Sequence, residues 1–244
     1  MKKIITTTLA ASLVASVYAA DVTLDFASAY VFRGYTFNDG AVIQPGIEAA
    51  GLGLAEELGS VSVGAWGNID VNDPYDSDSQ TSQFSEIDWY ASYGLPSVID
   101  GLDLSVGYCE YTYPLNGGSA DKEVNVGAGF EVAGVSFGAT IYKLIGGAYV
   151  GDTWYEVSAG YGIDVSDEVA LGLSADARVV DSVGGESGFN DYTLGADLSY
   201  TLNDVWSAGA SITYIGQGDD EVLVEEDGGY DVDVVGMFSL AASF

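Results

Sequence analysis

The residues of this sequence that could do chemistry are carboxylates at alternate positions of short apolar segments. Glu86 and Asp88 stand two apart in "EIDWY", and Asp231 and Asp233 stand two apart in "YDVDV". In an extended chain such pairs point to the same face. A face rich in carboxylates attracts cations and repels anions. We expect it to include Arg33, Glu48, Glu86, Asp88, Glu123, Glu156, Asp176, Arg178, Asp191, Asp197, Asp231 and Asp233.

Several other kinds of chemistry are excluded by composition. The chain has no histidine, so it lacks the commonest general base and transition-metal ligand. The sequence therefore predicts no catalytic residue and no enzyme. The chain has only six Lys and Arg against 37 acidic residues. Nucleic-acid binding needs clustered basic residues, so nucleic acid is not an expected partner. The single cysteine, Cys109, cannot form an intramolecular disulfide.

Two acidic segments could bind a metal ion. One is "NDPYDSDSQ", with Asp73, Asp76 and Asp78, and the other is "GDDEVLVEEDGGYDVD", which begins at position 218. Clusters of oxygen ligands suit Ca²⁺ or Mg²⁺, but neither spacing matches an EF-hand loop. A solvated acidic loop remains the alternative, and we expect no other cofactor.

The elements that position these residues are predicted to be strands. Segment after segment alternates apolar residues with small or polar ones, which is typical of strands with two different faces. The alternation predicts twelve strands, each long enough to cross a bilayer when tilted. They cover 22–35, 42–52, 60–71, 84–94, 102–113, 123–132, 135–144, 153–163, 169–180, 191–201, 205–216 and 230–244.

An even number of strands, joined alternately by short turns and mostly longer polar loops, is the signature of an outer-membrane barrel. The prediction is therefore an all-β fold, a transmembrane up-and-down antiparallel β-barrel, with extracellular loops and periplasmic termini. In "GMFSLAASF", apolar residues alternate up to Phe244. This strand must pair with the first, since lipid tolerates no open edge. Its ending resembles the recognition signal that bacterial barrels carry for their assembly machinery.

The first 20 residues have the composition of a secretory signal peptide. Lys2 and Lys3 precede an apolar stretch, and Ala19 and Ala20 provide small residues for cleavage. The apolar stretch is too short to span a membrane as a helix. We therefore expect residues 1–20 to be a cleaved signal peptide and residues 21–244 to form the barrel in the outer membrane of a Gram-negative bacterium.

The expected registers place two arginines among carboxylates inside the barrel. Glu156 should lie opposite Asp176, with Arg178 near Asp191, and barrel closure should bring Arg33 beside the pair at 231 and 233. An arginine inside a barrel satisfies carboxylates through its planar fork. Inward glycines at 127, 129, 138, 160, 162 and 172 favour open space in the lumen. A packed interior, in which glycines accommodate large neighbours, is the alternative.

The outer face should carry aromatic residues at two depths. Lys143 also falls on that face, near a strand end, where its ammonium could reach the lipid headgroups. Pro45 should interrupt the hydrogen bonding of its strand. The aromatic residues expected outside are Tyr30, Phe32, Trp89, Tyr108, Tyr155 and Tyr214 toward the loops, and Tyr93, Phe130, Phe137, Tyr161 and Phe244 toward the turns.

Blocks within residues 26–114 resemble the TorF family of proteobacterial porins. They are "SAYVFRGYTFNDGAVIQPGIEA", "VSVGAWGNIDV", "EIDWYASYGL" and "LDLSVGYCEYTYP". The resemblance implies an outer-membrane barrel that forms a pore, and it carries over no catalytic residue. Ala41 and Val42 depart from the Pro-Ala pair usual in the family. The positions that match are Tyr30, Phe32, Arg33, Gly34, Gln44, Trp66, Glu86, Asp88 and Tyr113.

The function predicted from the sequence is a porin for passive diffusion of small solutes, with a preference for cations because of its acidic lumen. The alternative is a structural or adhesive barrel that does not conduct, whose acidic loops bind divalent cations or a partner. Outer-membrane lipid and the assembly machinery are the other expected partners. The sequence leaves the oligomeric state open.

Overall fold

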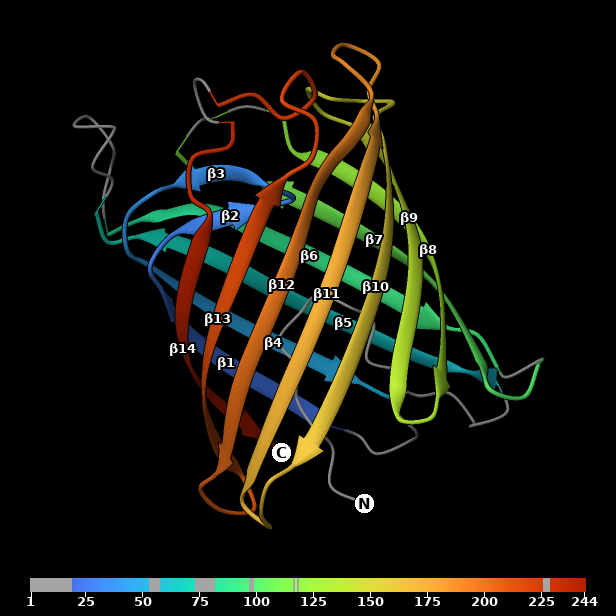
Figure 1. Ribbon diagram of the computed structural model, residues 1–244, viewed down its shortest axis with the longest axis vertical. Coiled ribbons are helices and arrows are strands. Elements are labelled where there is room, and N and C mark those ends of the chain that lie inside the picture. Colours follow the sequence, from blue (N-terminus) through green and yellow to red (C-terminus); the bar gives the residue numbers. More distant parts are fainter. Residues whose placement is uncertain are drawn as a thin grey trace.

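A computed structural model describes residues 19–52, 58–72, 82–96, 99–115, 117, 119–225 and 229–244. Over these residues twelve antiparallel strands close into a barrel, and a separate two-stranded hairpin lies within the first connection (Figure 1). The hairpin consists of β2 (Tyr30–Phe32) and β3 (Tyr35–Asn38). The wall of the barrel consists of β1 (Ala19–Ala27), β4 (Val42–Ala50), β5 (Ser60–Asp70), β6 (Phe84–Gly94), β7 (Leu102–Thr112), β8 (Asp121–Val132), β9 (Val135–Gly146), β10 (Thr153–Asp164), β11 (Val169–Asp181), β12 (Gly188–Thr201), β13 (Trp206–Gln217) and β14 (Val234–Ser243).

The barrel closes between its first and last strands, as expected. Leu24 pairs with Leu240 and Phe26 with Phe238 across β1 and β14. Beyond the end of β14, Phe244 donates its N–H to the carbonyl of Ala20 at 3.0 Å. Neighbouring wall strands are thus paired all the way round, and the predicted all-β barrel is confirmed.

Alternate side chains of the wall separate into an exposed apolar face and a more buried polar face. Trp89 is 55% exposed and Val157 59%, whereas Glu123 on the other face is 1% exposed. An apolar exterior with a polar interior is the pattern of barrels that cross membranes. Within the described ranges no helix has the length and apolar character needed to cross a membrane.

The first predicted strand is wrong beyond Ala27. β1 ends there, and the chain leaves the wall after Ser28, whose N–H and hydroxyl bond to the backbone of Gly236. The wall resumes at Val42, so the expected strand 22–35 is one wall strand followed by the hairpin β2–β3. The last strand is also shorter than predicted, because β14 begins only at Val234.

Pro45 interrupts the ladder of β4, as predicted. It pairs with Leu24 of β1, but the pairing with β5 skips from Ile43 to Gly46. A proline has no N–H to donate, so one side of its strand must lose a hydrogen bond. The signal peptide stays a prediction, since residues 1–18 lie outside the described ranges.

Candidate functional site in the barrel lumen

The β2–β3 hairpin is the feature that most shapes the lumen. Its two-residue turn is made by Arg33 and Gly34, with φ of 50° and 81°. Positive φ at both central residues belongs to the hairpin turn whose twist matches the flanking strands. A Cβ on Gly34 would lie 2.6 Å from Leu223 Cδ2. Glycine therefore lets the tip pack beneath the last long loop, where Leu223 is fully buried.

Arg33 clamps the tip of this hairpin to the far wall of the barrel. Its Nη1 donates to Oε2 of Glu123 on β8 at 2.7 Å, and its Nη2 donates to Oε1 at 3.1 Å. The Tyr111 hydroxyl donates to the same carboxylate at 3.1 Å. Burial disfavours the charge of Arg33, but Glu123 outweighs it and raises the pKa of Arg33. The clamp therefore carries a charged arginine at any physiological pH.

Aromatic rings surround the guanidinium group of Arg33. Its Cζ lies 4.7 Å from the ring centroid of Phe32, 4.4 Å from that of Tyr142 and 5.2 Å from that of Trp154. Cations are attracted to such ring faces, more strongly where water is excluded. The rings therefore add to the docking of the hairpin tip.

A second cluster lies beside the first and is joined to it. Arg178 donates to Glu156 and to Asp191, each at 2.7 Å. Asn190 donates to the carbonyl of Arg33 and to Asp191, each at 2.8 Å. The ladder of β11 and β12 shifts its register here, and the extra residue Asn190 is fully buried. Such bulges re-aim side chains, and this one supplies the link.

The base of the hairpin is held by β5 and β6. The hydroxyl of Tyr30 donates to Oε2 of Glu86 on β6 at 2.8 Å. Its ring centroid lies 5.4 Å from that of Trp66 on β5 and 5.2 Å from that of Phe37. The hairpin thus crosses the loop-side half of the lumen, from β5 and β6 at its base to β8 and β12 at its tip.

Several predicted placements need correction. Tyr30 is 8% exposed inside the barrel, and Phe32 packs with it, so neither belongs to an outer aromatic belt. Arg33 pairs with Glu123, whereas Asp231 and Asp233 are exposed. The reason is the same in each case: the chain leaves the wall after Ser28, so the alternation of β1 no longer decides which way these side chains point.

The predicted register of β10 and β11 is wrong by two residues. Glu156 lies opposite Arg178, and Asp176 lies opposite Ser158. The hydroxyl of Ser166 accepts hydrogen bonds from the backbone of Glu168 and Val169. This side chain stabilises a turn centred one residue later than expected, which shifts every pair of the ladder by two residues. The predicted approach of Arg178 to Asp191 is confirmed.

The predicted lumen residues occupy three environments. Sequence reasoning missed Asn190 and Leu223, because neither the bulge nor the inward fold of the last loop has a local sequence signal. Four of the predicted residues are buried, namely Glu86, Asp88, Glu123 and Asp191. Six are partly buried, namely Arg33, Glu48, Glu156, Asp176, Arg178 and Asp197. Asp231 and Asp233 are exposed.

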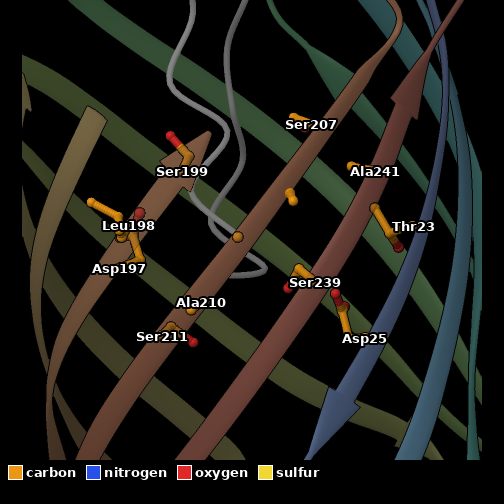
Figure 2. Close-up of a pocket in the computed structure, with 12 residues that line it drawn as sticks. Thr23, Asp25, Asp197, Leu198, Ser199, Ser207, Ala210, Ser211, Ser239 and Ala241 are labelled. Carbon is orange, nitrogen blue, oxygen red and sulfur yellow. The ribbon is translucent and has the colours of Figure 1, made fainter. Parts of the chain in front are cut away.

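The turn-side half of the lumen is lined by small and hydroxyl-bearing residues. A pocket in this wall spans β12, β13, β14 and β1 (Figure 2), and Asp25 and Asp197 are its two carboxylates. Gly172 of β11 leaves room for the Asp197 side chain, since a Cβ there would collide with it. Gly127, Gly138 and Gly160 likewise leave room for neighbouring serine hydroxyls. Hydroxyls of the pocket come from Thr23, Ser199, Ser207, Ser211 and Ser239.

The predicted metal ligands Asp73, Asp76 and Asp78 lie outside the described residues. In the part of the chain that the structure describes, no group of three or more Cys, Asp or Glu is arranged to hold a metal ion. The loop-bound Ca²⁺ or Mg²⁺ remains a prediction.

Sequence comparisons assign no family to this chain. No protein-family model matches it, and no curated protein matches it. The resemblance to the TorF family therefore stays a prediction.

Solved structures match the fold over nearly the whole chain. The COG4313 outer membrane channel from Pseudomonas putida F1 aligns with a TM-score of 0.60 at 8% identity, covering 98% of this chain and 100% of the other. The KdgM porin gives 0.53 at 9% identity, over 93% and 99%. The outer membrane phospholipase dimer of Salmonella typhi with bound calcium gives 0.53 at 12% identity, over 96% and 93%. The fold is thus that of outer-membrane barrels.

Proposed function

We propose that this protein is an outer-membrane channel through which small solutes diffuse passively, with a preference for cations. The observation that carries the proposal is the charge of the inner wall. Arg33 and Arg178 are the inward basic residues among those described, and their three ion-pair partners are Glu123, Glu156 and Asp191. Further inward carboxyl groups have no basic partner, so acidic residues outnumber basic ones in the lumen. Such a lumen concentrates cations and excludes anions.

The unpaired carboxylates lie at different depths of the lumen. Glu86 and Asp88 lie in the loop-side half, where Tyr30 of the hairpin contacts Glu86. Asp25 and Asp197 lie in the turn-side pocket (Figure 2). A cation moving along the lumen would therefore meet carboxyl groups beside the hairpin and again in the turn-side pocket.

The route through the lumen is narrow because the hairpin occupies its loop-side half. Twelve strands lie between eight-stranded barrels, which side chains fill, and sixteen-stranded porins, which hold a wide channel. Solutes would pass beside the hairpin or after its movement. We therefore infer a low-conductance channel.

The exposed apolar face supports a location in the outer membrane. Residues such as Val126, Ile141 and Leu194 are about half exposed on the outer face of the wall, where lipid would cover them. We further propose that the long loops face the cell exterior and the termini the periplasm, as is usual for such barrels.

Recording from the purified barrel in planar bilayers under a salt gradient tests this function. We expect small conductance steps and a reversal potential that favours the cation. A barrel without conductance steps would contradict the channel, and a reversal potential favouring chloride would contradict the cation preference alone.

A pair of variants tests which carboxylates set the preference. Asp176→Asn with Asp197→Asn removes two inward charges and should move the reversal potential toward zero. Glu110→Gln is the control for loss of a charge outside the lumen, because this residue lies on the outward face of β7, where Tyr108 donates to it at 2.8 Å. Equal shifts of the reversal potential in both proteins would show that Asp176 and Asp197 do not set the cation preference.

A non-conducting barrel is the second candidate, and the packing of the hairpin favours it. Asn190 and Asp191 are fully buried beside its tip, and Tyr30 at its base is 8% exposed. A permanently docked hairpin would make the protein a structural or adhesive barrel that binds partners through its acidic loops. The absence of conductance steps in wild type and in a hairpin-released variant would support this candidate.

A further inference from the structure

The basic residues of the barrel divide into two groups by position. Arg33 and Arg178 lie inside, and each is bonded to carboxylates. Lys122 and Lys143 lie on the exposed face of the wall, on the adjacent strands β8 and β9. After the predicted signal peptide the sequence contains no other lysine. The ammonium groups of Lys122 and Lys143 therefore lie on the same part of the outer surface.

The register brings the two lysines close together. Lys143 lies opposite Val124, and Lys122 is two residues before Val124 on the same face. The ladder shifts its register between Lys122 and Glu123, so Lys122 itself lies opposite Gly146, and the two lysines are neighbours across this irregularity. Lys122 also leans over β9, because a Cβ on Gly146 would lie 3.3 Å from its Cδ. The glycine thus leaves room for the stem of Lys122 to lie across β9 at Gly146, three residues beyond Lys143.

Neither lysine has a carboxylate partner among the described residues. The cross-strand neighbour of Lys122 is Glu110, but no oxygen of Glu110 lies within 4.0 Å of its ammonium group. Glu110 accepts the hydroxyl proton of Tyr108. The carboxylate of Asp121 is bonded to Tyr113 and to the backbone of Ala148. Glu110 keeps its negative charge beside Lys122 but forms no ion pair with it, so both ammonium groups can still bind an external anion.

The position of the pair along the strands indicates which anion it meets. Lys122 is the second residue of β8, and Lys143 is three residues from the end of β9, so both lie at the loop-side ends. Toward the turns the same face continues with Val126, Ile141 and Phe137, which are 59%, 48% and 38% exposed. Ammonium groups directly above an apolar band stand at the level of lipid headgroups.

We propose that Lys122 and Lys143 form a binding site for the phosphate headgroup of a membrane lipid in the leaflet on the loop side. Charge-assisted hydrogen bonds from two ammonium groups to phosphate oxygens hold the headgroup, while its acyl chains lie along the apolar face of β8 and β9. Most of the surface of this acidic protein repels a phosphate group, so the two lysines determine where the headgroup binds. The site rests on the membrane location proposed above and is independent of conduction.

Native mass spectrometry of the full barrel in detergent tests the site, with dimyristoyl phosphatidic acid as the probe and dimyristoylglycerol as the lipid without phosphate. The wild type should bind the phosphatidic acid more tightly than the diacylglycerol. Lys122→Gln with Lys143→Gln should raise the dissociation constant for phosphatidic acid at least about tenfold, on the order of one lost charge-assisted hydrogen bond. Binding of the diacylglycerol should stay the same.

Lys122→Arg with Lys143→Arg is the matched control, because it keeps both charges at the same positions. It should bind phosphatidic acid about as well as the wild type. Equal binding of the two lipids by the wild type, or equal binding of phosphatidic acid by the glutamine variant, would overturn the site. Both outcomes are independent of conductance, so this site and the proposed channel can fail separately.

Discussion

Replacing Arg33 by alanine should release the hairpin from the far wall. The change removes both hydrogen bonds to Glu123, which is 1% exposed and would be left as a buried charge. Breaking a buried ion pair by removing one partner costs about 3–5 kcal/mol. At about 1.4 kcal/mol per factor of ten, the ratio of docked to released hairpin should fall between about a hundredfold and several thousandfold. We expect larger or noisier conductance steps in planar bilayers.

Cys109 offers a second measurement of the same event. It is the single cysteine of the chain, it is buried, and it lies opposite Glu123 in the wall. Release of the hairpin should expose it, so a thiol-reactive maleimide should label it faster in the Arg33→Ala protein. Adding Glu123→Gln removes the uncompensated charge and should recover part of the loss. If neither conductance nor the labelling rate changes in Arg33→Ala, the clamp does not hold the hairpin in place.

Two further substitutions test other contacts of the hairpin. Gly34→Val should undock the tip, because it introduces a β-branched side chain at a φ of 81° and against Leu223, and the labelling of Cys109 should rise as in Arg33→Ala. Unchanged labelling would show that the tip tolerates a side chain there. Tyr30→Phe removes the hydroxyl that donates to the 5%-exposed Glu86 and should lower the free energy of unfolding by about 1–3 kcal/mol, as measured by urea titration in detergent. A loss below a few tenths of a kcal/mol would mean that water replaces the hydroxyl.

The wall of the barrel could be predicted because its pattern is local. Segments such as the one around Leu194 and Leu198 alternate apolar outward residues with polar or small inward ones, and a single strand contains all the information needed. Barrel closure follows from the physical requirement that lipid leaves no strand edge unpaired. The register of a hairpin is less secure, because one turn residue such as Ser166 changes the pairing of all residues after it.

The hairpin could not be predicted because its residues satisfy two patterns at once. Tyr30 and Phe32 alternate with smaller residues, as they would on a strand that faces lipid, and they equally suit the inside of the barrel, where Trp66 and Tyr111 receive them. Alternation predicts which side chains share a face, but it does not predict whether the strand remains in the wall. The partner that decides this is Glu123, 90 residues farther along the chain from Arg33.

The block of Phe32, Arg33 and Gly34 that resembles a porin family therefore has a different meaning from the one its position suggested. On a wall strand its arginine would line a pore with its side chain extended. In the structure the arginine and the glycine form a turn at positive φ, and the aromatic residue stacks on the guanidinium group. These residue types together suit a hairpin tip inside the lumen. Gly34 permits the close packing against Leu223, Arg33 binds the buried carboxylate of Glu123, and the ring of Phe32 lies against the guanidinium group of Arg33. In the proposed channel, the hairpin rather than the width of the barrel would then control passage.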